Sequence, residues 1–281
     1  MLKIEGVVKQ YHLHRSWLGG HEIIKAVDGV SLGVKTGESF GIVGESGCGK
    51  STLAKLIVML EEPTQGSIYF GGQNIADLSK VGRRELRKDM QIVFQDTYAS
   101  LNPRFSIRES LEEPICNFSL EGKFPPAKRI QELLDIVELP KRILFRYPSE
   151  LSGGERQRVC IARALMLKPR FIIFDEATSG LDVTLQSQIL EMLKELRSVM
   201  GLTYLFITHN LKLIPYITER VAVMYKGKIM EEMDSGKLHQ TVHPYTQMLL
   251  AAIPASHPKE RRIHAAAVGD KQQWDESAIS N

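Results

Sequence analysis

The sequence predicts an α/β fold, because apolar runs of strand length recur along the chain and two of them enclose a helical pattern. The runs are 39–44, 90–95, 170–176 and 203–209. The last two are nearly continuous in apolar residues, which is typical of a parallel sheet covered on both faces. Between them, 183–200 carries apolar residues at helical spacing. This order predicts a strand–helix–strand crossover.

Two other segments predict antiparallel hairpins beside the parallel sheet. Residues 66–75 turn at Gly71-Gly72, and residues 221–233 turn near Lys226-Gly227. Two-residue turns that contain glycine are a common connection between antiparallel strands. We therefore expect both parallel and antiparallel pairing in this chain.

The middle of the chain and its end differ from the strand segments. Residues 97–165 contain helical patterns, such as 127–140, and are interrupted by proline. They predict a helical lobe inserted between two strands of the core. Residues 254–281 are polar and aperiodic, so we expect an extended or disordered tail. The predicted organisation is one domain over 1–253 followed by this tail.

Composition and charge narrow the class of protein. The 281 residues are 43% hydrophobic and 25% charged, as in ordinary globular proteins. The first residues lack the apolar core of a signal peptide, and no run of about 18 apolar residues occurs, so a membrane role must come through a partner. A net charge of +3 is too small to indicate nucleic-acid binding. Cys48, Cys116 and Cys160 match no zinc or disulfide spacing, which predicts a reducing cytosolic compartment.

The stretch GESGCGKST, residues 44–52, satisfies the pattern G-x-x-x-x-G-K-[ST] between a predicted strand and a predicted helix over 50–60. Glycines let backbone N–H groups turn inward around phosphate oxygens, and the helix N-terminus adds its dipole. We expect Lys50 to reach the outer phosphates and the Ser51 hydroxyl to ligate Mg²⁺. The pattern predicts a P-loop NTPase core that binds a nucleoside triphosphate through Gly44, Glu45, Ser46, Gly47, Cys48, Gly49, Lys50, Ser51 and Thr52.

Two acidic residues end the apolar run 170–176. Asp175 stands where a carboxylate can hold the coordination shell of Mg²⁺. Glu176 follows directly, so its side chain points elsewhere and can polarise an attacking water. Two acids at a strand end are often only structural, but beside a phosphate loop they predict hydrolysis of the bound triphosphate.

The stretch LSGGERQRVCIARAL, residues 151–165, places a serine and two glycines at a predicted helix start. A P-loop site is complete without such a second anion cradle, which makes sense if it caps a phosphate held by another subunit. These residues resemble the nucleotide-binding subunit of ABC transporters, in which LSGGQ is the signature motif and two subunits sandwich two ATP molecules head to tail. Glu155 replaces the usual glutamine, and both residues can contact ribose or loop backbone. The resemblance implies that ATP is contacted by Ser152, Gly153, Gly154 and Glu155.

The resemblance covers residues 1–253 and implies a RecA-like core with an antiparallel β subdomain and an inserted helical subdomain. It implies ATP and Mg²⁺ as cofactors, with Ser51, Gln95 and Asp175 around the metal. Gln95 matches the Q-loop glutamine, which senses Mg²⁺ and the attacking water. Asp182, in SGLD, matches the D-loop that communicates across the dimer, and His209 matches the switch histidine that contacts the γ-phosphate.

Tyr11 is the candidate for stacking on adenine, because it ends the first strand pattern, IEGVVKQY. A tyrosine of the core or surface is the alternative. Nearby, His12, His14 and His21 predict a solvent loop and no metal site, since no acidic or cysteine partner accompanies them.

Three stretches resemble the oligopeptide, dipeptide and nickel importer branch: 43–55, 95–114 and 243–250. This implies a second ATPase subunit, favouring a heterodimer over a homodimer, two permease subunits and an extracytoplasmic substrate-binding protein, at the cytoplasmic face of the inner membrane. The helices after Gln95 should form a groove for a permease coupling helix. ATP then closes the dimer, the helical lobes move, the permease switches access, and hydrolysis through Glu176 resets the cycle.

The cargo stays open between peptides and nickel or other metal chelates. The tail lacks the clustered cysteines of many peptide-type members, which predicts no iron–sulfur cluster and is somewhat closer to the metal-chelate members. A different class, soluble ABC ATPases that act on DNA or ribosomes, usually has a long coiled-coil insert or two ATPase units per chain. A P-loop kinase or switch protein would leave 151–155 and His209 unexplained.

Overall fold

The centre of the protein is a six-stranded sheet in the order β10-β9-β3-β8-β7-β6. The computed structural model describes residues 1–15, 20–120 and 125–253. All neighbouring strands of this sheet are parallel except β9 and β10, which form the hairpin predicted around Lys226-Gly227. The strands are β3 (Ser39–Val43), β6 (Met90–Val93), β7 (Phe171–Asp175), β8 (Thr203–Thr208), β9 (Arg220–Tyr225) and β10 (Lys228–Asp234).

The predicted crossover is confirmed. Strands β7 and β8 pair in parallel, with Phe171 opposite Thr203, and every residue of both strands is buried. Helix α6 (Val183–Met200) connects them and ends at Gly201, whose φ of 63° closes the helix in the left-handed conformation. Because the carboxyl ends of β3, β7 and β8 meet at one edge of the sheet, the residues that follow these strands are brought together.

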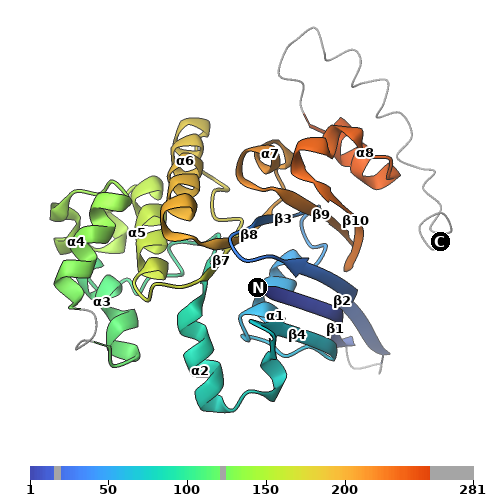
Figure 1. Ribbon diagram of the computed structural model, residues 1–281, viewed down its shortest axis with the longest axis horizontal. Helices are drawn as coiled ribbons and strands as arrows, with labels where there is room; N and C mark the ends of the chain where they lie inside the picture. Colours follow the sequence, from blue (N-terminus) through green and yellow to red (C-terminus); the bar gives the residue numbers. More distant parts are fainter. Residues whose placement is uncertain (16–19, 121–124, 254–281) are drawn as a thin grey trace, which may run out of the picture.

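A second, four-stranded sheet is antiparallel, with the order β2-β1-β4-β5. Gly71 and Gly72 form its predicted two-residue turn, and both have positive φ. The sheet packs on the central sheet through buried residues such as Ile4, Phe70 and Phe171, and Figure 1 shows it to one side of β3 and β9. Its strands are β1 (Leu2–Arg15), β2 (Gly20–Val34), β4 (Gln65–Phe70) and β5 (Gln73–Asn74).

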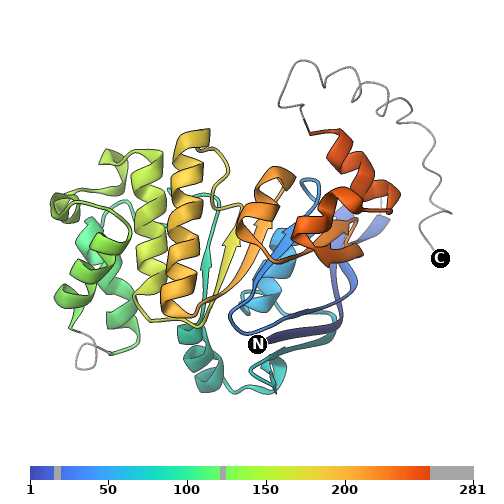
Figure 2. The same ribbon diagram turned by 45° about the horizontal axis from the view of Figure 1, so that its top comes forward.

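The helix-rich middle segment lies on the opposite side. In Figures 1 and 2, its helices gather beyond α6, away from the antiparallel sheet. They follow β6 and precede β7, which are neighbours in the central sheet, so this group is an insertion between two core strands. Its members are α3 (Ile107–Asn117), α4 (Pro126–Ile136) and α5 (Gly153–Leu165), with the 3₁₀ helices η2 (Lys141–Phe145) and η3 (Pro148–Glu150).

The remaining helices lie outside the inserted group. Within the part of the chain that the structure describes, no helix is both long and apolar enough to cross a bilayer. These remaining helices are α1 (Lys50–Ile57), η1 (Ile75–Asp77), α2 (Lys80–Asp89), η4 (Leu211–Leu213), α7 (Ile214–Ile217), η5 (Ser235–Gln240) and α8 (Pro244–Ala251).

Several predicted boundaries were wrong. Strand β1 runs past Tyr11, and the three histidines lie in β1 and β2, with His14 opposite His21, where a loop was expected. Among the described strands, β6 is at the end of the sheet order, beside β7. Their pairing stops at Val93 opposite Phe174, so Gln95 lies two residues beyond the strand. Helix α1 ends at Ile57, before the positive φ of Met59. The prediction for residues 254–281 lies outside the described residues.

Candidate active site

The phosphate loop joins β3 to α1 and is enclosed by two other strands. A Cβ added to Gly44 would lie 2.1 Å from the carbonyl oxygen of Met224, and one added to Gly49 would lie 2.0 Å from that of Ala26. Gly49 also has a φ of 110° and is the N-cap of α1. These two positions therefore accept only glycine, because the backbones of β2 and β9 occupy the space of any side chain.

Lys50 lies within the loop and is buried, with 3% of its surface exposed. Its Nζ donates to the carbonyl oxygens of Gly44 and Glu45, each at 2.8 Å. The Cys48 amide donates to the same Glu45 oxygen at 3.3 Å. The loop thus curls around the ammonium group at the N-terminus of α1, where positive charge and N–H donors suit the outer phosphates of a nucleotide.

Ser51 and Asp175 meet although they are far apart in sequence. The Ser51 hydroxyl donates to Oδ1 of Asp175 at 3.0 Å. Burial raises the pKa of the Asp175 carboxyl, and the hydrogen bond from Ser51 opposes that shift. A hydroxyl and a carboxylate beside a triphosphate are the hard oxygen ligands that Mg²⁺ prefers, so this pair fits the predicted metal.

Gln95, the third residue predicted around the metal, is placed differently. It is exposed and lies in the segment after β6, where its carbonyl accepts from the Thr97 amide at 3.1 Å. Among the described residues, no hydrogen bond joins Gln95 to Ser51 or Asp175. The structure therefore brings two of the three predicted metal residues together.

Glu176 and His209 form a second contact pair at the same edge of the sheet. Oε2 of Glu176 lies 3.0 Å from Nδ1 of His209, the residue that follows β8. The Glu176 amide donates to the carbonyl of Ile207 at 2.9 Å, and its φ of 51° turns the chain away from β7. A carboxylate and an imidazole thus lie together where β7 and β8 end.

The signature segment begins α5 with a capping box. Ser152 is the N-cap, its hydroxyl accepts from the Glu155 amide at 3.2 Å, and Oε2 of Glu155 accepts from the Ser152 amide at 2.9 Å. This backbone hydrogen bond lowers the pKa of Glu155. Glutamate can therefore replace the usual glutamine at position 155, because either residue completes the capping box S-x-x-[EQ].

Asp182 caps the next helix, and its segment contacts the signature segment. Oδ1 of Asp182 accepts from the Leu185 amide at 2.9 Å at the start of α6. A Cβ added to Gly154 would lie 3.2 Å from Leu185, and one added to Gly153 would lie 3.6 Å from Leu181. The two segments predicted to face a second subunit are thus packed against each other within this one.

Tyr11 lies beside the start of α1, next to the phosphate loop. Its hydroxyl donates to Oε2 of Glu61 and also interacts with Thr52. Burial and the hydrogen bond to Glu61 raise the pKa of Tyr11, and the ammonium of Lys9 lies 5.3 Å from the centroid of its ring. Glu61 was not predicted as a site residue, because nothing in the local sequence indicates that it meets a tyrosine fifty residues earlier.

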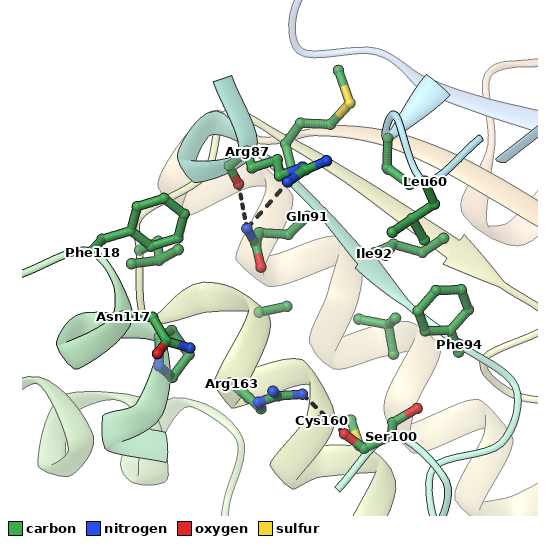
Figure 3. Close-up of a pocket in the computed structure, with 16 residues that line it drawn as sticks. Leu60, Arg87, Gln91, Ile92, Phe94, Ser100, Asn117, Phe118, Cys160 and Arg163 are labelled. Carbon is green, nitrogen blue, oxygen red and sulfur yellow. Dashed lines mark hydrogen bonds between the residues drawn. The ribbon is translucent and has the colours of Figure 1, made fainter. Parts of the chain in front are cut away.

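A groove of about 350 Å³ lies beside β6, between the end of α2 and helices α3 and α5 (Figure 3). The view shows Arg163 of α5 donating to the Ser100 carbonyl, at 3.0 Å, and Gln91 of β6 donating to the carbonyl of Arg87. Phe94, the residue before Gln95, also lines the groove. The groove thus begins where the Q-loop segment leaves the sheet.

Comparison with known proteins identifies the family of this chain. A family model described as ABC transporter matches residues 27–179. The oligopeptide transport ATP-binding protein AppF of Bacillus subtilis is 46% identical over 256 residues, which cover 90% of this chain and 78% of AppF. The di/tripeptide transport ATP-binding protein DppF of Pseudomonas aeruginosa is 41% identical over 259 residues, 92% of this chain and 80% of DppF.

Solved structures agree as well. The dimeric post-hydrolysis state of the ATP-binding cassette MJ0796, bound to ADP and Pi, superposes with a TM-score of 0.74 at 34% identity, covering 84% of this chain and 99% of that one. The structure of cbiO1 from Clostridium perfringens, part of the transporter complex cbiONQ, gives 0.73 at 27% identity, covering 94% and 97%. The predicted fold is confirmed, and the chain belongs to the ABC transporter family as one of its ATP-hydrolysing, nucleotide-binding subunits.

Proposed function

We propose that this chain is the ATPase subunit that drives peptide import through a membrane permease. The observation that carries the proposal is the division of the site between two parts of the fold. The phosphate loop, Asp175, Glu176 and His209 gather at the edge of the central sheet, whereas Ser152 begins α5 in the inserted helical group. A site divided in this way is completed when a second subunit supplies its own signature segment.

The proposed function gives each predicted site residue a task. Lys50 and the loop amides would hold the triphosphate. Ser51 and Asp175 would hold Mg²⁺, which when bound would neutralise charge on the phosphate oxygens. Glu176 accepts a proton from the attacking water, and His209, which bonds to the Glu176 carboxylate, orients it. Gln95 reports on this centre from the segment that leads to the groove, and Asp182 faces the second subunit. The tyrosine ring at position 11 stacks on the base.

We assign the groove between β6 and the inserted helices to the permease. Its apolar floor includes Ile92 and Ala164, and arginine side chains of α2 and α5 line it (Figure 3). It adjoins both the Q-loop segment and the helix that begins with the signature residues. A permease helix seated there would move with the helical group when ATP closes the dimer, which couples the site to transport.

The proposed function includes the partners of this subunit. We propose a heterodimer with a second ATPase, two permease subunits and an extracytoplasmic substrate-binding protein, at the cytoplasmic face of the inner membrane. We propose peptides as the cargo before metal chelates, because the relatives AppF and DppF carry the names of oligopeptide and di/tripeptide transport proteins. The same names favour transport over a soluble ABC ATPase acting on DNA or ribosomes.

Uptake into vesicles tests this function. The complete complex, with its binding protein, is reconstituted so that this subunit faces the vesicle interior. Such vesicles should accumulate labelled di- to pentapeptides when ATP is enclosed inside them. Unlabelled peptides should compete with this uptake. Replacement of the subunit by its Lys50→Ala variant should abolish uptake, whereas Lys80→Ala, an exposed lysine of α2, should not. Competition by a nickel chelate but by no peptide would contradict the proposed cargo, and ATP-independent uptake would contradict the proposed role.

A further inference from the structure

The segment HPYT, residues 243–246, marks the importer branch in the sequence, and no catalytic step uses it. In the structure it starts α8 and binds to β10. The His243 Nδ1 accepts from the Tyr245 amide at 3.2 Å, and Pro244 occupies the first helical turn. The Thr246 hydroxyl, fully buried, donates to Oε2 of Glu231 at 2.8 Å. These contacts hold the start of α8 in a defined position.

Tyr245 extends from this anchored helix start to the phosphate loop. It is buried, its ring centroid lies 4.3 Å from that of Tyr225, and its hydroxyl accepts from the Glu45 amide at 3.5 Å. Burial raises the pKa of Tyr245, so the hydroxyl stays neutral at physiological pH. Two residues that are far apart in the sequence thus meet at the first peptide unit of the loop.

That peptide unit is held at both ends. Its N–H, from Glu45, donates to Tyr245, and its carbonyl, from Gly44, accepts from Lys50 Nζ at 2.8 Å. The peptide is planar, so fixing the N–H also fixes the direction of the carbonyl. The carbonyl oxygen of Met224 occupies the space that a Cβ of residue 44 would need, so this peptide must begin with glycine. Tyr245 and Lys50 therefore fix both polar groups of the first peptide unit of the loop.

We propose that Tyr245 is a positioning residue for ATP binding, acting through the Gly44–Glu45 peptide to hold the phosphate loop in its binding shape. The proposal rests on the proposed function of this loop. A loop already in the bound geometry loses less conformational freedom when the triphosphate binds, which favours affinity. If the Gly44–Glu45 peptide is no longer held by Tyr245, ATP should bind more weakly. The chemical step, which depends on Glu176, should be unchanged.

The test compares Tyr245→Phe with a matched control, Tyr225→Phe, in the full-length chain. Each variant loses one hydroxyl and keeps its ring in the Tyr225–Tyr245 pair. We expect Tyr245→Phe to raise the KM for ATP about threefold, as for one weak hydrogen bond, with kcat and melting temperature near wild type. We expect Tyr225→Phe to leave the KM unchanged.

The other outcomes overturn the proposal. An unchanged KM in Tyr245→Phe, with or without a lower melting temperature, would mean that Tyr245 only packs α8. An equal rise of KM in both variants would assign the effect to ring packing. Lys50→Ala, measured by ATP titration, separates this inference from the proposed function. If Lys50→Ala abolishes binding and Tyr245→Phe has no effect, only the inference fails. Normal ATP affinity in Lys50→Ala would refute the assigned loop itself.

Discussion

Nδ1 of His209 lies 3.0 Å from Oε2 of Glu176, so the residue after β8 contacts the residue after β7. The parallel pairing of these strands produces the contact, because Asp175 pairs with Ile207 and the chain positions that follow remain adjacent. The Glu176 amide is fixed by the Ile207 carbonyl as well. The carboxylate is therefore oriented by both its backbone and the imidazole.

His209→Ala should slow ATP hydrolysis about 10- to 100-fold while ATP affinity changes little, since displacement of a catalytic group by about 1 Å can cost that much. Steady-state turnover and ATP titration on the full chain measure the two quantities. His239→Ala, in η5, is the control and should keep wild-type turnover. Turnover within twofold of wild type in His209→Ala would remove His209 from the catalytic arrangement.

Asp175→Asn should stabilise the magnesium-free protein at neutral pH. Burial raises the pKa of Asp175 in the folded chain above its ordinary value of 3.8, which the unfolded chain keeps. At a pH between the unfolded and the folded pKa, the folded chain therefore binds more protons than the unfolded chain. The free energy of unfolding therefore falls as the pH rises through that window, and the cost persists above it. The neutral amide removes this cost and still accepts from Ser51.

Thermal unfolding in chelator from pH 4.5 to 8 measures the Asp175 effect. The variant should melt higher than wild type at pH 7, by about 2–4 °C for each 1 kcal/mol of relieved cost, and the gap should close toward acid pH. Turnover should be lost in the same variant. A variant that melts lower than wild type at pH 7 would show that the charge of Asp175 stabilises the fold.

Glu155→Ala should lower the stability of the chain by about 1 kcal/mol, because it removes half of the capping box of α5. Glu155→Gln should keep nearly the wild-type free energy of unfolding, since glutamine also accepts from the Ser152 amide. Urea unfolding of the three proteins gives the comparison. Equal losses in both variants would mean that the charge of Glu155, and not its cap, stabilises the helix.

Tyr11→Ala should raise the KM for ATP roughly tenfold, because stacking of an aromatic ring on a base is worth about 1–3 kcal/mol. Tyr11→Phe keeps the ring and should retain most of the affinity. Tyr216→Ala is the matched control, since Tyr216 is 68% exposed and also has a lysine ammonium above its ring, 5.8 Å from the centroid. An unchanged KM in Tyr11→Ala would leave Tyr11 a structural residue held by Glu61.

The core of the fold was predictable because its signals are local. The buried strands around Asp175 and His209 are short and continuously apolar, and α6 between them has helical periodicity. The phosphate loop requires glycine where neighbouring backbones leave no room, as at Gly44 and Gly49. These requirements are visible in the residues themselves.

Other features depend on contacts that local sequence does not specify. Strand β2 was missed because its pairing with β1 shifts register around Val7 and Lys9, which interrupts the alternation of side chains. Helix α2 has no buried residue, so it lacks the apolar stripe by which helices are found. The contacts of Tyr11 with Glu61 and of Tyr245 with Glu45 arise from the tertiary fold alone.

In the proposed function, Glu176 accepts a proton from the water that attacks ATP, in a site that two subunits close together. Glu176→Gln, compared with Glu195→Gln on the exposed face of α6, tests it most directly. With ATP and Mg²⁺, Glu176→Gln should bind ATP, lose at least about 100-fold in turnover and persist as an ATP-bound dimer in size-exclusion chromatography with the partner ATPase. Glu195→Gln should turn over ATP and dissociate. Near wild-type turnover in Glu176→Gln would exclude Glu176 as the proton acceptor, and an ATP-bound protein that stays monomeric would exclude a site shared by two subunits.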